Sequence, residues 1–114
     1  MEPFVVWYGL KQTLRGNDVS NVTEVTFNGE FLGRTCFPVC GDDDSGVDTV
    51  FYRAEDGRIV VHVVRWTRLA NVATQADIYV YNDLEEAQKS FGLEMQRAGV
   101  IPPRRLTLKE FTGR

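Results

Sequence analysis

The only histidine of the chain, His62, is the first side chain whose chemistry needs an interpretation. It lies in the segment DGRIVVHVVRW, residues 56–66, between two pairs of valines. A catalytic histidine needs a nucleophile or a carboxylate within hydrogen-bonding distance. The strand pairing derived below places Phe51 opposite His62 and Arg53 diagonal to it, and a neighbouring guanidinium disfavours the charged imidazolium. We therefore predict that His62 is a neutral, largely buried residue rather than a base.

Carboxylates gather in the segment GDDDSGVD, residues 41–48, where a divalent cation with oxygen ligands is the functional alternative to consider. The EF-hand pattern does not fit this segment. If Gly46 takes the sixth position of such a loop, Gly41 takes the first and Tyr52 the twelfth, and neither supplies a carboxylate. We therefore predict a solvated acidic turn before a strand, and no metal site.

The two cysteines, Cys36 and Cys40, form no C-x-x-C motif. Together with His62 they fall short of the four ligands of a zinc site. We interpret them as small structural residues, and a catalytic pair of a cysteine with His62 has no support in the spacing. The chain also lacks a phosphate-binding loop, a dinucleotide-binding fingerprint, a nucleophile elbow and a zinc-protease helix. These absences disfavour an enzyme, and we predict no cofactor.

Two turn dipeptides organise the strands that hold these residues. Asn28-Gly29 separates VTEVTF from EFLGRT, and Asp56-Gly57 separates TVFYRAE from RIVVHVV. Both dipeptides accept the positive φ angles of a two-residue hairpin turn. The second turn predicts the cross-strand pairs Glu55–Arg58, Ala54–Ile59, Tyr52–Val61, Phe51–His62 and Asp48–Arg65.

This register gives the second hairpin two largely apolar faces. One face carries Val50, Tyr52, Ala54, Ile59, Val61 and Val63, and the other carries Phe51, Val60, His62, Val64 and Trp66, with Arg53 among them.

Two further segments have strand character. Residues 73–81 alternate, with Ala76, Ile78 and Val80 on one face and Asp77, Tyr79 and Tyr81 on the other. Residues 4–9 predict an edge strand, whereas residues 10–21 lack clear periodicity and predict a loop.

One clear helix is predicted over residues 83–98. Asp83 and Glu86 have the spacing of a capping box, and Gly99 followed by Pro102-Pro103 ends the helix. Its apolar stripe consists of Leu84, Ala87, Phe91, Met95 and Ala98. Gly92 suggests a close crossing of helix and sheet, and a last short turn is predicted to begin at Thr107.

The predicted fold class is α+β. A strongly curved, antiparallel meander sheet of five to six strands is packed by the single helix in the C-terminal half of the chain. The length of 114 residues favours a single globular domain over residues 1–114. One helix covers only part of one face, so either the sheet curls until its second face closes on itself, or another molecule covers that face.

The uncovered face predicts a homodimer. We expect two copies to bury one of two surfaces. The first is the face of Val60, His62, Val64 and Trp66, and the second is the face of Tyr79 and Tyr81, which we expect to lie beside the first. Tyr and Trp side chains are typical of interfaces, because their rings are apolar and their polar O–H or N–H group can stay in contact with water. The candidate ligand or interface residues are therefore His62, Trp66, Tyr79, Tyr81, Tyr52, Arg53 and Val64.

The favoured function is a small, non-enzymatic interaction or regulatory protein that works through its sheet face. The alternative is a small-molecule-binding protein or minor enzyme with a pocket lined by His62, Tyr79, Tyr81 and Trp66. The formal net charge of −3 disfavours a nucleic-acid partner, although residues 40–57 are mainly acidic and residues 97–114 mainly basic. The start of the chain has no signal-peptide pattern, and no stretch is apolar enough to span a membrane, so we expect a cytoplasmic protein with reduced thiols.

Overall fold

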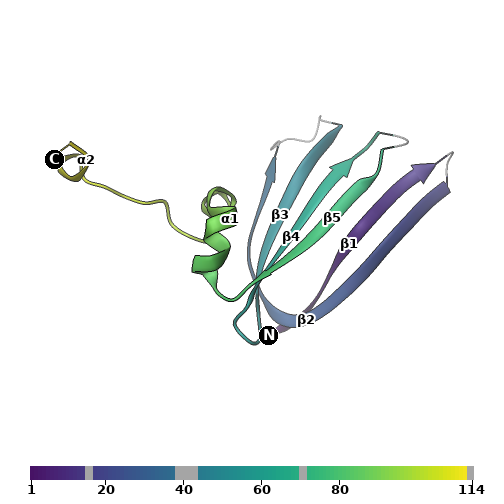
Figure 1. Ribbon diagram of the computed structural model, residues 1–114, viewed down its shortest axis with the longest axis horizontal. Coiled ribbons are helices and arrows are strands. Elements are labelled where there is room, and N and C mark those ends of the chain that lie inside the picture. The colour runs from purple at the N-terminus through teal and green to yellow at the C-terminus, as the bar shows by residue number, and fades with distance from the viewer. Residues whose placement is uncertain (15–16, 38–43, 70–71, 113–114) are drawn as a thin grey trace.

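The computed structural model describes residues 1–14, 17–37, 44–69 and 72–112. Within these residues, five strands are followed by two helices in the order of the chain (Figure 1). They are β1 (Glu2–Leu14), β2 (Asn17–Phe37), β3 (Ser45–Ala54), β4 (Ile59–Thr67), β5 (Thr74–Tyr81), α1 (Leu84–Arg97) and α2 (Leu108–Thr112). The predicted combination of a five-stranded antiparallel sheet with one main helix is confirmed.

The sheet closes into a barrel, whereas the sequence predicted a strongly curved meander and left open whether its second face closes on itself. Each strand pairs with the next, and β1 also pairs with β5 through Gly9–Ala76, Leu10–Gln75 and Lys11–Thr74. Every one of these pairings is antiparallel. Closure therefore covers one face of the sheet without a second molecule.

The strand β2 reverses its direction within its own length. Its residues from Asn17 to Gly29 pair with β1, and its residues from Gly29 to Phe37 pair with β3. Only Gly29 has a partner on both strands, Glu2 and Ala54. In Figure 1, β2 descends beside β1 and turns at the lower end of the sheet before it rises beside β3.

The hairpin predicted at Asn28-Gly29 is therefore wrong, because the two segments that flank it pair with different strands. The dipeptide still marks a change of direction. A Cβ atom on Gly29 would lie 2.2 Å from the carbonyl oxygen of Arg53, so only glycine lets β2 approach the β3–β4 turn this closely. The Asn28 carbonyl accepts a hydrogen bond of 2.8 Å from the amide of Glu55 and fixes the bend to that turn.

The second predicted hairpin is present, but its register differs by one residue. The amide of Ala54 donates to the carbonyl of Arg58 and the amide of Gly57 donates to the carbonyl of Ala54, so the loop has one more residue than predicted. Gly57 adopts a φ of 89°, as expected for a type I turn followed by a left-handed residue. Phe51 consequently pairs with Val61, and His62 pairs with Val50.

This shift exchanges the faces of β3 relative to β4, because side chains alternate along a strand. On the outer face, Phe51 joins a core beneath α1 whose other buried members are Ile59, Val61, Val63, Ala87 and Met95. On the inner face, Val6, Ala54 and Val60 form a second core with Phe27, Tyr52 and Ile78. Both faces of β4 are thus packed within one chain.

The helix α1 forms close to the predicted range, and its backbone has non-helical angles at Phe91 (φ −126°, ψ 24°), where the helix is kinked. The Asp83 side chain accepts a hydrogen bond of 2.8 Å from the Glu86 amide, and Glu86 accepts one from the amide of Asn82. The predicted apolar stripe faces the outer core. Gly92 does not mark a close crossing, because a Cβ atom there would meet only the Gln88 side chain, at 3.6 Å.

The predicted loop over residues 10–21 is wrong where the structure describes that segment. The β1–β2 ladder continues through Leu10–Asn21 and Lys11–Ser20. These side chains are exposed, so no alternation of apolar and polar residues signals the strand. Backbone pairing, rather than burial, defines this part of the ladder.

We expect Gly29→Ala to lower the free energy of unfolding by roughly 1–3 kcal/mol, because the new methyl group meets the Arg53 backbone. Urea denaturation measures the change. The matched control is Gly92→Ala, which should raise stability by about 0.5–1 kcal/mol in the open helix position. Equal effects of the two substitutions would contradict the close approach at the bend.

Candidate functional site

His62 connects two strands that are distant in the sequence. The β1–β5 ladder ends at Gly9–Ala76, and its register, if continued, would place Trp7 opposite Ile78. Instead His62, the partner of Ile78 on β4, reaches the backbone of Trp7. Its Nε2 atom lies 2.8 Å from the Trp7 carbonyl oxygen and 3.4 Å from the Trp7 amide nitrogen. The two rings meet edge to face, 6.0 Å apart.

The contact with the carbonyl determines the tautomer of His62. A ring nitrogen cannot donate to the carbonyl and accept from the amide at the same time, so the shorter contact places the proton on Nε2. Burial lowers the pKa of His62 below its ordinary value, and the hydrogen bond to Trp7 offsets part of that effect. The imidazole is therefore neutral, as predicted, although burial is the cause and Arg53 is not.

The other residues predicted for the site are divided between the two faces of the sheet. Tyr52, Val64 and Trp66 share the inner face with His62, since cross-strand partners point to the same side. Tyr52 packs against Phe4 and Phe27, and burial raises the pKa of its hydroxyl.

Tyr79 and Tyr81 lie on the outer face, where both rings contact Phe91 of α1 at 5.4 and 6.1 Å. Arg53 is also on the outer face and forms an ion pair of 3.0 Å with Glu30. The tyrosine face is therefore opposite the His62 face and not beside it. A pocket shared by His62, Tyr79 and Tyr81 is not formed.

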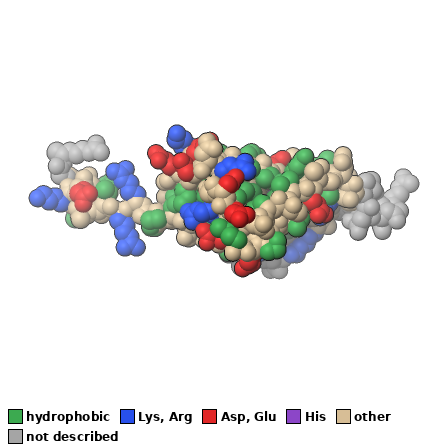
Figure 2. Space-filling model, turned by 90° about the horizontal axis from the view of Figure 1, so that it is seen from below, with side chains coloured by type: hydrophobic (Ala, Val, Ile, Leu, Met, Phe, Trp, Pro, Cys, Tyr) green, Lys and Arg blue, Asp and Glu red, His purple; other side chains and the backbone are tan. Residues whose placement is uncertain are grey.

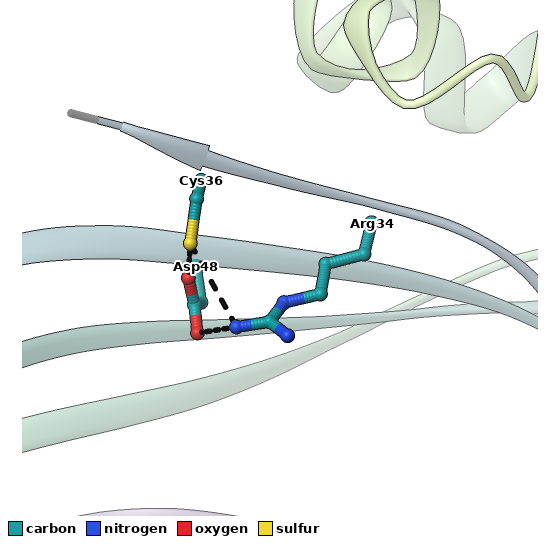
Figure 3. Close-up of polar contacts among 3 residues, drawn as sticks. All are labelled: Arg34, Cys36 and Asp48. Carbon is teal, nitrogen blue, oxygen red and sulfur yellow. Dashed lines mark hydrogen bonds and ion pairs between the residues drawn. The ribbon is translucent and has the colours of Figure 1, made fainter. Parts of the chain in front are cut away.

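A polar cluster that the sequence did not indicate joins β2 to β3 (Figure 3). Cys36 and Asp48 are cross-strand partners, and the thiol of Cys36 donates a hydrogen bond to the Asp48 carboxylate. The other carboxylate oxygen of Asp48 accepts a hydrogen bond of 2.6 Å from Arg34. Asp48 therefore pairs with Arg34 and not with the predicted Arg65, whose ion-pair partner is Asp77.

This cluster makes Cys36 a poor nucleophile. The hydrogen bond to Asp48 and burial raise the pKa of the thiol, and Arg34 offsets only part of this effect. The reactive form of cysteine is the thiolate, which this environment disfavours. The cluster borders a surface depression of about 530 Å³ that is also lined by Phe37 and Arg97. One of its two guanidinium groups, that of Arg34, is already neutralised by Asp48.

The predicted acidic turn and cysteine pair lie partly outside the described residues, because Cys40, Asp42 and Asp43 are not described. Asp44 is exposed. Within residues 1–14, 17–37, 44–69 and 72–112, no cluster of three or more His, Cys, Asp or Glu side chains is arranged to hold a metal ion.

The C-terminal segment forms a projecting arm, which we define as residues 102–112. Every residue of the arm is exposed. Its large apolar side chains, Leu106, Leu108 and Phe111, are 46, 77 and 70% exposed. Figure 1 shows the arm leaving α1 in the direction away from the sheet and ending in α2.

The predicted turn at Thr107 is confirmed and gives the arm a defined end. The Thr107 hydroxyl accepts a hydrogen bond of 3.1 Å from the Glu110 amide and donates one to the Glu110 carboxylate. Leu108 and Phe111 are three positions apart and so lie on one face of the turn. A short helical surface is thus formed before any partner binds.

Comparison with protein families, with curated proteins and with solved structures gave no match. The helices of the described residues include none that is long and apolar enough to cross a membrane.

We expect the stability of the protein to fall as the pH is lowered from 7 to 5. The folded pKa of His62 lies below the unfolded value of about 6.5, so its contribution is complete above that pH. It is lost as the pH falls through the unfolded and then the folded pKa, because the unfolded chain binds the proton more readily.

Urea denaturation at a series of pH values measures this effect. His62→Gln is the control, since it keeps an N–H donor and does not titrate, and its profile should be flatter. A wild-type profile as flat as that of the variant would show that His62 does not titrate differently on folding.

We expect Asp48→Asn to accelerate alkylation of Cys36 at pH 8 several-fold, in a Cys40→Ser background. The substitution removes the charge that holds the proton on the thiol and leaves Arg34, which favours the thiolate. The rate of reaction with iodoacetamide gives the readout. Asp77→Asn, which changes a carboxylate paired with Arg65, is the matched control and should leave the rate unchanged. A slower or equal rate for Asp48→Asn would argue against the cluster.

Proposed function

We propose that this chain is a small, non-enzymatic interaction protein of the cytoplasm, and that the arm is its docking element. The observation that carries the proposal is the exposure of Leu106, Leu108 and Phe111 on a segment that leaves the folded body. Burial of such a side chain contributes about 1.5–3 kcal/mol, so three of them supply a substantial part of a binding energy.

The chemistry of the polar side chains supports an interaction role over catalysis. His62 is neutral and uses its Nε2–H on a backbone carbonyl. The Cys36 thiol is held in its protonated form by Asp48. Both His62 and Cys36 are thus committed to contacts that hold the strands together.

The arm replaces the sheet face as the surface proposed for partners. Closure of the barrel packs part of the inner face, and α1 packs part of the outer face. Val5, Phe31 and Val80 of the strands stay 58, 55 and 50% exposed, but they lie on the folded body and not on a projecting segment. An amphipathic turn with Leu108 and Phe111 on one side suits the mode in which a short helix lies in an apolar groove. A homodimer remains part of the proposal, now with the arm rather than the strands as the contact.

Site-specific photocrosslinking in the native host tests this function. A benzophenone amino acid at position 108 should give a covalent adduct of defined mass after irradiation. The same probe at position 93 is the control, because Leu93 is similarly exposed, at 59%, but lies on α1. The absence of any adduct specific to position 108 would refute the docking role of the arm.

A further inference from the structure

We propose that the arm of one chain docks on the end of the barrel of a second copy, at a depression beside the bend of β2. This inference rests on the proposed function and names the partner of the arm. The depression has a volume of about 310 Å³ and is lined by Phe27, Asn28, Ala54, Glu55, Asp56 and Arg58.

The shape and chemistry of this depression fit the arm. Phe27 and Ala54 supply apolar wall for a side chain such as Phe111. Glu55 and Asp56 at its edge are exposed and acidic. Arg58 in the same lining forms an ion pair of 2.7 Å with Asp56, which leaves Glu55 as the acid for the arm. The arm carries Arg104, Arg105 and Lys109 against a single acid, Glu110, so the two surfaces have opposite charge.

The acidic character extends beyond the depression to the other side of the β3–β4 turn. There, Asp83 and Glu85 line a second depression of about 360 Å³ together with Arg53, so each of the two depressions holds two acids and one arginine. Phe27 supplies the first depression with an aromatic wall, which favours it as the receptor for Phe111. Figure 2, which views the molecule from below, shows acidic and basic side chains among apolar ones over the body, and basic side chains together with acidic surface on the arm.

The connection to α1 favours a second copy over the arm's own barrel. Pro102 and Pro103 follow Ile101, and consecutive prolines hold the chain extended. The arm leaves α1 away from the barrel, along the 62 Å axis of the molecule (Figure 1). A chain that docked its own arm would have to reverse direction at the residues least able to turn.

Two-fold symmetry makes the arrangement reciprocal. Each chain supplies one arm and one depression, so every contact occurs twice. Stable interfaces bury roughly 1,200–2,000 Å² in total, and two reciprocal contacts bury twice the area of one. We therefore expect a dimer that forms at micromolar concentration and weakens with salt.

Sedimentation equilibrium of the full chain tests the proposal. The wild-type protein should show twice its chain mass of 13.0 kDa at tens of micromolar. Phe111→Asp should raise the dissociation constant at least tenfold, and Leu93→Asp on α1 should leave it unchanged. A wild-type protein that is monomeric at 100 µM, or a dimer indifferent to Phe111→Asp, overturns the inference.

A charge exchange between two variants tests the receptor. Glu55→Arg alone and Arg104→Glu/Arg105→Glu alone should each weaken the homodimer, and an equal mixture of the two should restore a dimer of one chain of each kind. Monomers in the mixture, or a dimer indifferent to Glu55→Arg, overturn the assignment of the depression. If the chain is monomeric while position 108 crosslinks to a different protein, the proposed function stands and the second copy is excluded.

Discussion

The direction of β2 is the constraint on which the rest of the structure depends. Five antiparallel strands that follow one another around a sheet alternate in direction, so the first and the fifth run the same way. Here β1 and β5 are antiparallel, which requires one strand to reverse, and β2 does so at Gly29. The reversal joins the two ends of the sheet, encloses Val6 and Val60, and leaves Phe51, Val61 and Val63 on the outer face to pack against α1.

Features set by neighbouring residues could be predicted from the sequence. Asp83 and Glu86 marked the start of α1, the apolar stripe marked its buried face, and Thr107 marked the short turn in the arm. Asp56-Gly57 gave the position of the β3–β4 turn. In each case the signal lies within a few residues of the structure that it specifies, so no knowledge of the fold was needed.

Features that depend on distant segments were not predictable in the same way. Asn28-Gly29 looks like a hairpin turn because its sequence does not reveal that Glu2 and Ala54 occupy the two sides of Gly29. The β3–β4 loop is one residue longer than the two-residue turn that Asp56-Gly57 predicts. This single residue places Phe51 on the same face as Val61 and not on the face of His62. The carbonyl partner of His62 comes from β1, 55 positions away, and no local pattern announces it.

The two strands that pair with β1 are synthesised at different times, so the two edges of β1 become paired one after the other. The β1–β2 ladder can form as soon as β2 has been synthesised. The opposite edge of β1 can pair only after β5 has been synthesised, and its contact with His62 joins residues 55 positions apart. Ribosomes add about 5–20 residues per second, so the emerging β1–β2 ribbon presents an open edge for several seconds. Unpaired strand edges attract other strands. Nascent chains that stop before β5 therefore expose the stretch of β1 from Gly9 to Lys11 to pairing with other strands.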